Sequence, residues 1–113
     1  MRDDRSRLQD ITEAADLIRL FTQGRTLDDL RKDRLLESAL LHQLTVIGEA
    51  ARRVSDEIKE KYPDVPWKIV QGFRNHIAQE YFALDLNIVW QTVTADVPRL
   101  REQIDTVIQK EFH

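Results

Sequence analysis

The sequence contains no cysteine, and its 113 residues include only three glycines and three prolines. Without cysteine, neither a disulfide framework nor a thiolate metal site can form, which is compatible with a reducing compartment. The shortage of glycine and proline argues against a turn-rich β-sandwich and against disorder. A hydrophobic content of 42% with 33% charged residues is instead typical of a mostly helical protein.

Long hydrophobic runs are also absent. No apolar stretch approaches the roughly 20 residues of a membrane span, and the first five residues, Met1-Arg2-Asp3-Asp4-Arg5, are mostly charged. We therefore expect neither a secretory signal nor a membrane anchor, and we expect a cytoplasmic protein. The chain length fits one compact unit, so we predict a single helical domain over residues 1–113.

The chain has no excess of positive charge. Its formal net charge is −3, opposite in sign to that of a protein that coats nucleic acid through counterion release. Broad, non-specific RNA binding is therefore disfavoured. A local positive site can still hold one phosphate, because the surface field can be patchy while the sum is negative.

Apolar residues at intervals of three and four predict helices in the first half of the chain. The first helix begins near Leu8 and can be terminated by Gly24. A second, long helix runs to Val54 and has two possible starts, a capping box that begins at Thr26 and an N-cap at Asp33. These patterns account for about half of the chain.

Two prolines, Pro63 and Pro66, mark the principal loop, because each lacks an amide donor. Pro66 suits the first turn of a third helix, and Asp85 can cap a fourth helix that Pro98 should kink or split. Four helices with short connections predict an all-α fold, an antiparallel four-helix up-and-down bundle.

Chemically active side chains gather in the run Gly72-Phe73-Arg74-Asn75-His76-Ile77-Ala78-Gln79-Glu80-Tyr81-Phe82. The planar guanidinium of Arg74 can hold a phosphate in two hydrogen bonds. Its ordinary alternative is a surface salt bridge to a carboxylate such as Glu80. Arg74 is the main candidate for a catalytic residue.

The neighbours of Arg74 each have an ordinary and a functional interpretation. Asn75 is either a helix-end hydrogen bonder or an amide that positions phosphate, and His76 is either a partly buried hydrogen bonder or an auxiliary proton carrier. Gln79 cannot perform acid–base chemistry, because an amide does not exchange a proton usefully at neutral pH. Tyr81 is by default a half-buried aromatic with its hydroxyl at the surface.

Glu49 is a second auxiliary candidate, although it is equally a solvated acid on the long helix. The preceding Gly48 costs helix stability and suggests the close approach of another helix. A basic rim near the site is also conceivable, or these cations simply solvate the second helix and its loop; they are Arg52, Arg53, Lys59, Lys61 and Lys68.

Geometry limits how the motif can act. At about 100° per residue, Arg74 and Gln79 lie about 140° apart on one straight helix, so they cannot face a single phosphate together. Either the helix breaks after the first residues of the motif, or two copies face each other across a symmetric dimer.

The run resembles the signature of HepT-type HEPN ribonuclease toxins, which is arginine-asparagine, three residues, histidine, any residue and tyrosine. Gln79 stands where that signature has its histidine. The resemblance extends over nearly the whole chain, and its other marks are Ile47-Gly48-Glu49-Ala50, Tyr62-Pro63, Pro66-Trp67, Gly72-Phe73, Glu80-Tyr81-Phe82, Asp85, Trp90 and Pro98-Arg99-Leu100.

This resemblance implies a HEPN-like homodimer, open to a larger hetero-oligomer, that acts as the toxin of a toxin–antitoxin pair. It implies a metal-independent endoribonuclease without a cofactor, with transfer RNA or messenger RNA as substrate. Arg74 would stabilise charge on the scissile phosphate, Asn75 would orient the site, and the role at Gln79 would be vacant. A minimal nucleotidyltransferase antitoxin would adenylylate Tyr81.

Two explanations of Gln79 stay open at this point. The glutamine either marks an engineered inactive form of a toxic enzyme or a naturally inactive relative. In the second case the chain is a non-catalytic helical interaction module that binds the nucleotidyltransferase or another protein. A purely structural helical domain is a third interpretation.

Overall fold

The structure, a computed structural model, describes residues 3–79 and 85–112, and leaves undescribed the side chains of residues 74–79. All regular elements within these residues are helical, which confirms the predicted all-α class. They are α1 (Asp4–Thr22), α2 (Leu27–Lys32), α3 (Arg34–Arg53), α4 (Asp56–Lys61), α5 (Trp67–Gln79), α6 (Leu86–Gln91), a π-helical turn η1 (Thr92–Asp96) and α7 (Val97–Glu111).

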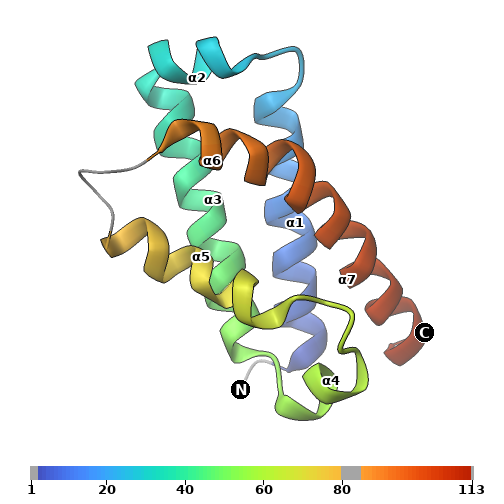
Figure 1. The fold of residues 1–113 in the computed structure, drawn as a ribbon. Coiled ribbons are helices and arrows are strands. Elements are labelled where there is room, and N and C mark those ends of the chain that lie inside the picture. The colour runs from blue at the N-terminus through green and yellow to red at the C-terminus, as the bar shows by residue number, and fades with distance from the viewer. Residues whose placement is uncertain (1–2, 80–84, 113) are drawn as a thin grey trace.

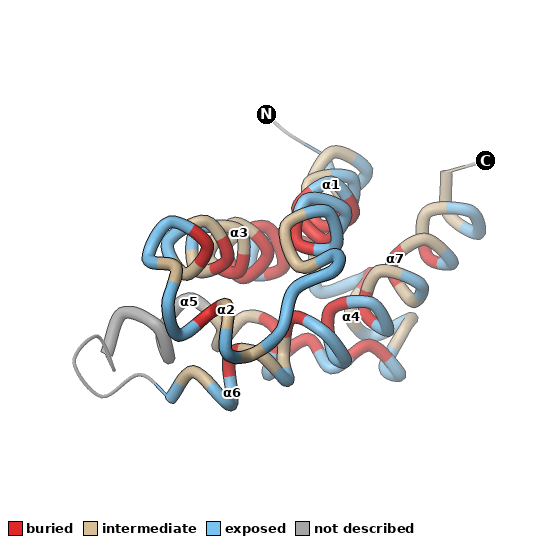
Figure 2. Tube along the Cα trace, turned by 90° about the horizontal axis from the view of Figure 1, so that it is seen from above, coloured by how far each residue is buried: buried red, intermediate tan, exposed pale blue. Residues whose placement is uncertain are grey.

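The long helices pack in antiparallel fashion around one core. In Figure 1, α1 runs upward, α3 returns beside it, and α7 descends along the other side of α1. Helix α5 packs against α3 and crosses it obliquely in that view. Viewed from above, the buried faces of α1, α3 and α7 turn inward toward one another (Figure 2).

The predicted apolar stripes form this core. Completely buried side chains include Leu8, Ile11 and Ile18 of α1, and Leu40 and Ile47 of α3. Not every apolar residue is buried: Ile88 of α6, for example, is 51% exposed. The core otherwise follows the apolar periodicity of the long helices.

Local capping explains the helix boundaries. Thr26 and Asp29 form the predicted capping box at the start of α2, and Gly24, with a φ of 72°, lies in the left-handed region just after α1. Asp33 receives a hydrogen bond from the backbone of Leu36 and begins α3. Both proposed starts of the second helix are therefore used, and Asp33 divides the expected single helix into α2 and α3.

The last helical segment bends near Pro98, as predicted. The backbone stays helical from α6 through η1 into α7, but the direction of the chain changes between α6 and α7 (Figure 1). The Val97 amide bonds to the carbonyl of Thr92, five residues back, which is the π-helical pattern. Pro98 has no amide to donate to Thr94, so regular α-helical bonding cannot continue through this turn.

A group of polar contacts closes the lower end of the molecule in Figure 1. Asp4 of α1 accepts hydrogen bonds from the backbone and the hydroxyl of Ser55, at 2.9 and 2.6 Å. Tyr62 donates its hydroxyl to Glu111 of α7 at 2.5 Å, and Lys61 pairs with the same carboxylate at 2.8 Å. We call this region the base; it joins α4 and the two ends of the described chain.

Candidate functional site

Helix α5 carries the candidate motif, and its start is fixed by local chemistry. The Pro66 carbonyl accepts the first helical hydrogen bond, from Val70 at 3.0 Å, so the helix begins directly after the proline. Trp67 is buried and donates its indole N–H to the Tyr62 carbonyl at 3.0 Å. The buried indole therefore anchors the beginning of α5 to the loop before it.

The four motif positions from Arg74 to Gln79 all lie in this one helix, which continues without interruption from Trp67. A helix break within the motif, one of the two geometric alternatives, is therefore wrong through Gln79. Tyr81, the candidate modification site, lies outside the described residues. The backbone positions of Arg74 and Gln79 are consequently about 140° apart around the axis of a single helix.

The two sides of α5 differ in their surroundings. Trp67 and Val70 are buried against the core, and position 74 follows them by seven and four residues, so its backbone lies on this packed side. The opposite side starts with Ile69, which is 68% exposed. A Cβ built on Gly72, three residues further, would meet nothing within 4 Å.

Gly72 and positions 76 and 79 follow Ile69 by three, seven and ten residues. This spacing follows the helical repeat, so all four positions lie along one side of the helix. We call Ile69, Gly72 and the backbone positions of His76 and Gln79 the outer stripe of α5. Ile69 was not among the functional residues predicted from the sequence. Its position opposite Trp67 and Val70 in a continuous helix was the signal that could have found it.

Glu49 lies on α3, the helix against which α5 packs. Its carboxylate is 3.4 Å from the Arg52 guanidinium and 3.8 Å from that of Arg53, so two cations of the conceivable basic rim pair with it. Gly48 beside it is buried in the interior, as expected for a close helix contact. Glu49 and two arginines thus form a charged cluster on the helix next to the motif.

Two further members of the conceivable basic rim have other contacts. Lys61 pairs with Glu111 in the base, which raises the pKa of its ammonium. Lys59 donates to the Arg52 carbonyl at 3.2 Å, and partial burial lowers its pKa. Lys68 is exposed in the first turn of α5. The five cations therefore do not form one continuous basic rim.

Residues 3–79 and 85–112 contain no group of three or more histidine or acidic side chains placed to hold a metal ion. In the same ranges, no helix combines the length and apolar composition that crossing a bilayer requires.

The helical fold and the motif on α5 define an all-α protein of the HEPN-like class. Comparison with known families gives the next step, because the family described as "Ribonuclease HepT-like" matches residues 11–107. The chain belongs to this family.

Proteins similar to this chain are named as ribonucleases. A Methanocaldococcus jannaschii protein named "Putative RNase" is 33% identical, over 94% of this chain and 97% of the relative. A "Probable ribonuclease HepT" of Thermococcus cleftensis is 31% identical, over 92% of this chain and 94% of the relative. A Caldanaerobacter subterraneus protein, also named "Putative RNase", is 32% identical, over 98% of this chain and 99% of the relative. No solved structure matches the chain significantly. Membership of this family supports a ribonuclease-type function.

Proposed function

We propose that the chain is a metal-independent endoribonuclease toxin that works as a homodimer and whose activity is crippled by Gln79. The observation that carries this proposal is the uninterrupted helix α5 in a HepT-like chain. One helix directs Arg74 and Gln79 about 140° apart, so a single subunit does not bring both to one phosphate. A second copy can supply the missing group.

The outer stripe of α5 is the part of the surface we assign to this dimer. An isoleucine that is 68% exposed is an unusual neighbour for a polar motif, and burying it against a second copy would be favourable. Gly72 leaves room for close approach, because its added Cβ would meet nothing within 4 Å. An isologous contact across this stripe would bring position 79 of the two copies together. Arg74 begins on the packed side of α5, so the proposal requires its side chain to extend around the helix to the shared cleft.

The chemistry we propose uses Arg74 to stabilise negative charge on the scissile phosphate and Asn75 to orient that phosphate. A histidine at position 79 would assist attack by the ribose 2′-hydroxyl or protonate the leaving oxygen, which glutamine cannot do. His76 is an auxiliary proton carrier, and Glu49 with its arginine partners is an auxiliary charged group beside the site. Transfer RNA or messenger RNA is the proposed substrate.

Regulation completes the proposal. A minimal nucleotidyltransferase antitoxin would attach adenylate to Tyr81, two residues beyond the described end of α5. The added phosphate would compete with RNA for the guanidinium of Arg74 and fill the cleft, which would inactivate the toxin. We place this pair of proteins in the cytoplasm.

The test is restoration of the histidine. Gln79→His protein incubated with total RNA should cleave it at least about a hundredfold faster than the present sequence, since general acid–base catalysis contributes about that much or more. Adding Arg74→Ala should abolish the gain. An intact RNA population after incubation with a folded Gln79→His dimer would refute the nuclease proposal.

That refuting outcome would favour a second function, for which Gln79 is the specific motivation. A chain with a natural glutamine at this position would serve as a non-catalytic helical module that binds the nucleotidyltransferase. Co-purification of the present sequence with the partner would support the module, provided that the Gln79→His variant also leaves RNA intact.

A further inference from the structure

A groove on the opposite side of α1 from α3 has no role in the proposed nuclease site. It lies between α1 and the η1–α7 segment and has a volume of about 640 Å³. This size is in the range of small-molecule sites. All of its lining residues lie within the described part of the chain, and they include the π-helical turn, a geometry that often occurs at functional positions.

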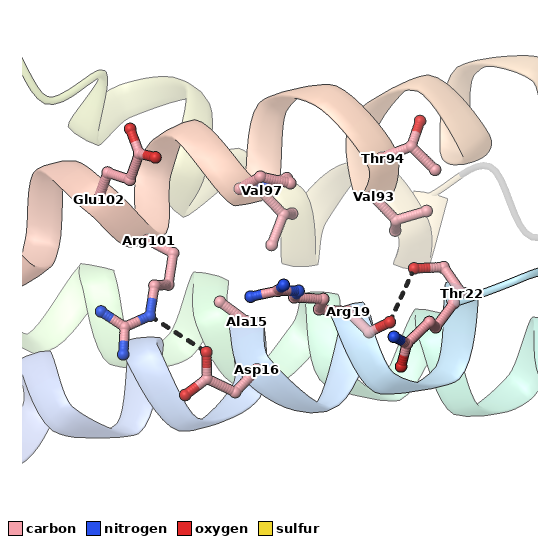
Figure 3. A pocket seen from close by; sticks show the side chains of 11 residues that line it. Ala15, Asp16, Arg19, Thr22, Val93, Thr94, Val97, Arg101 and Glu102 are labelled. Atoms are coloured by element: carbon pink, nitrogen blue, oxygen red, sulfur yellow. Dashed lines mark hydrogen bonds and ion pairs between the residues drawn. The ribbon is translucent and has the colours of Figure 1, made fainter.

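One end of the groove is closed by ion pairs. Arg101 of α7 donates to Asp16 of α1 at 3.1 Å and lies 3.3 Å from Asp105. Glu102 lies at the same end (Figure 3). The Arg101 guanidinium is therefore already neutralised, and this end has no attraction for a further anion.

The middle and the other end of the groove differ from this end. Arg19 lies in the middle, between Asp16 and Thr22 of the same helix, and Thr22 and Thr94 lie at the end away from Arg101 (Figure 3). Among residues 3–79 and 85–112, Arg19 makes no ion pair, and the neighbouring Asp16 pairs with Arg101 instead. A guanidinium that lines a groove without such a partner is suited to a phosphate, which it can hold in two hydrogen bonds.

The two threonines define a second requirement for the ligand. Thr22 donates its hydroxyl hydrogen to the Ile18 carbonyl at 2.9 Å, and Thr94 donates to the Trp90 carbonyl at 2.7 Å. Their oxygens consequently offer lone pairs to the groove and have no hydrogen left to donate. They favour a ligand that carries hydroxyl donors next to its anionic group.

The third requirement comes from the apolar wall. Val93 and Val97 are buried side chains that border the groove, and Pro98 and Ala15 extend this apolar surface. A flat, weakly polar ring can lie against such a wall and gain free energy by leaving water. A nucleoside monophosphate combines a phosphate, hydroxyl donors on its ribose and a flat base.

We propose that this groove binds a nucleoside monophosphate unit, either free or as the 5′-phosphorylated end of an RNA. The phosphate binds Arg19, the ribose hydroxyls donate to Thr22 and Thr94, and the base packs on Val93, Val97 and Pro98. None of the residues that line this groove lies on α5, so nucleotide binding here is independent of the proposed ribonuclease activity.

The experiment titrates the full chain with adenosine monophosphate, adenosine and inorganic phosphate, and follows backbone amide signals by NMR. We expect adenosine monophosphate to shift signals of α1 and η1, and adenosine to bind at least about tenfold more weakly, because a charge-assisted hydrogen bond is lost. Equal binding of the two, shifts confined to α5, or no binding at millimolar concentration would each overturn the proposal.

Matched variants assign the contacts. Arg19→Gln should weaken binding of adenosine monophosphate about tenfold or more, whereas Arg25→Gln, which removes an exposed arginine paired with Asp33 at 3.4 Å, should leave it unchanged. Thermal melting checks that both variants fold. Equal affinity of the Arg19→Gln protein and the unaltered chain would contradict the assignment.

The source of the nucleotide is decided by a last pair of titrations. A short RNA with a 5′-phosphate is compared with the same RNA without it, in the unaltered chain and in Arg19→Gln. Tighter binding of the phosphorylated RNA than of adenosine monophosphate, dependent on Arg19, identifies an RNA end as the ligand. Arg19-dependent binding of the free nucleotide alone identifies a soluble nucleotide.

Discussion

The base of the molecule and the outer stripe of α5 use their residues in opposite ways. In the base, carboxylates accept hydrogen bonds from Ser55 and Tyr62, so polar groups there join elements that are far apart in the sequence. On the outer stripe, a large isoleucine is left 68% exposed, and a Cβ added to the nearby Gly72 would meet nothing within 4 Å. The difference separates a region that stabilises the fold from one that is available to a second molecule.

The largest effect is expected when an isoleucine of the core and an isoleucine of the outer stripe are each replaced by alanine. Ile47 is completely buried, so Ile47→Ala should lower the free energy of unfolding by about 2–5 kcal/mol. Ile69→Ala should change it by less than about 0.5 kcal/mol in dilute protein, because the side chain is exposed. Urea unfolding measures both, and equal losses would show that the outer stripe is part of the folding core.

A charge on the outer stripe should separate the subunits. Ile69→Asp would bury an unpaired carboxylate in the proposed interface, so we expect self-association to weaken at least about a hundredfold. Analytical ultracentrifugation measures this, and RNA cleavage in the Gln79→His background should fall in parallel. Leu20→Asp on α1 is the control, since Leu20 is 62% exposed but far from α5 in sequence and on another helix. A monomer produced by Leu20→Asp instead would place the interface on α1.

A smaller effect is expected from the polar contacts of the base. Ser55 caps α4 through Ile58 and also donates to Asp4, so Ser55→Ala should cost about 1–2 kcal/mol of unfolding free energy. Ser38→Ala, at an exposed position within α3, is the matched control and should be nearly neutral. Identical urea midpoints for the two variants would mean that the Asp4 contact does not stabilise the base.

The smallest expected effect appears at alkaline pH. The hydrogen bond to Glu111 raises the pKa of Tyr62 above its usual value, and the same carboxylate raises the pKa of Lys61. A raised pKa means that the stabilisation is complete below pH about 10 and is lost as the pH rises through the folded-state pKa. Between pH 9 and 11, a window around the usual tyrosine pKa of about 10, the free energy of unfolding should therefore fall less in Tyr62→Phe than in the unaltered chain. Parallel pH profiles from urea unfolding would contradict the role of this contact.

Prediction from sequence succeeded where signals are local. Thr26 and Asp85 cap helices as expected, and Gly24 follows the first helix with the positive φ that its residue type allows. The helix α4 was missed, because its six residues contain a single apolar residue, Ile58, and show no periodicity. Its stability depends on burial of Ile58 and on the distant carboxylate of Asp4.

The candidate site was predictable in composition but only partly in arrangement. Arg74, Asn75, His76 and Gln79 were recognised from their spacing, and the helix that carries them lies where the prolines predicted it. Whether the helix breaks inside the motif could not be decided from the sequence, because neither a glycine nor a proline interrupts residues 73–79 and propensity alone does not exclude a bend. The groove around Arg19 was not predicted at all, since its walls come from two distant segments.

The sequence by itself determined the all-α class, most helix boundaries and the family, because caps, apolar periodicity and motif spacing act over a few residues. Only the tertiary structure decided which side of α5 is packed and which remains open, since this depends on how Trp67 and Val70 meet the core. The tertiary structure also creates the base and the groove. In the base a hydrogen bond joins Ser55 to Asp4, 51 positions away, and at the groove one joins Arg101 to Asp16, 85 positions away. Such contacts form only after the helices have packed, and no local pattern encodes them.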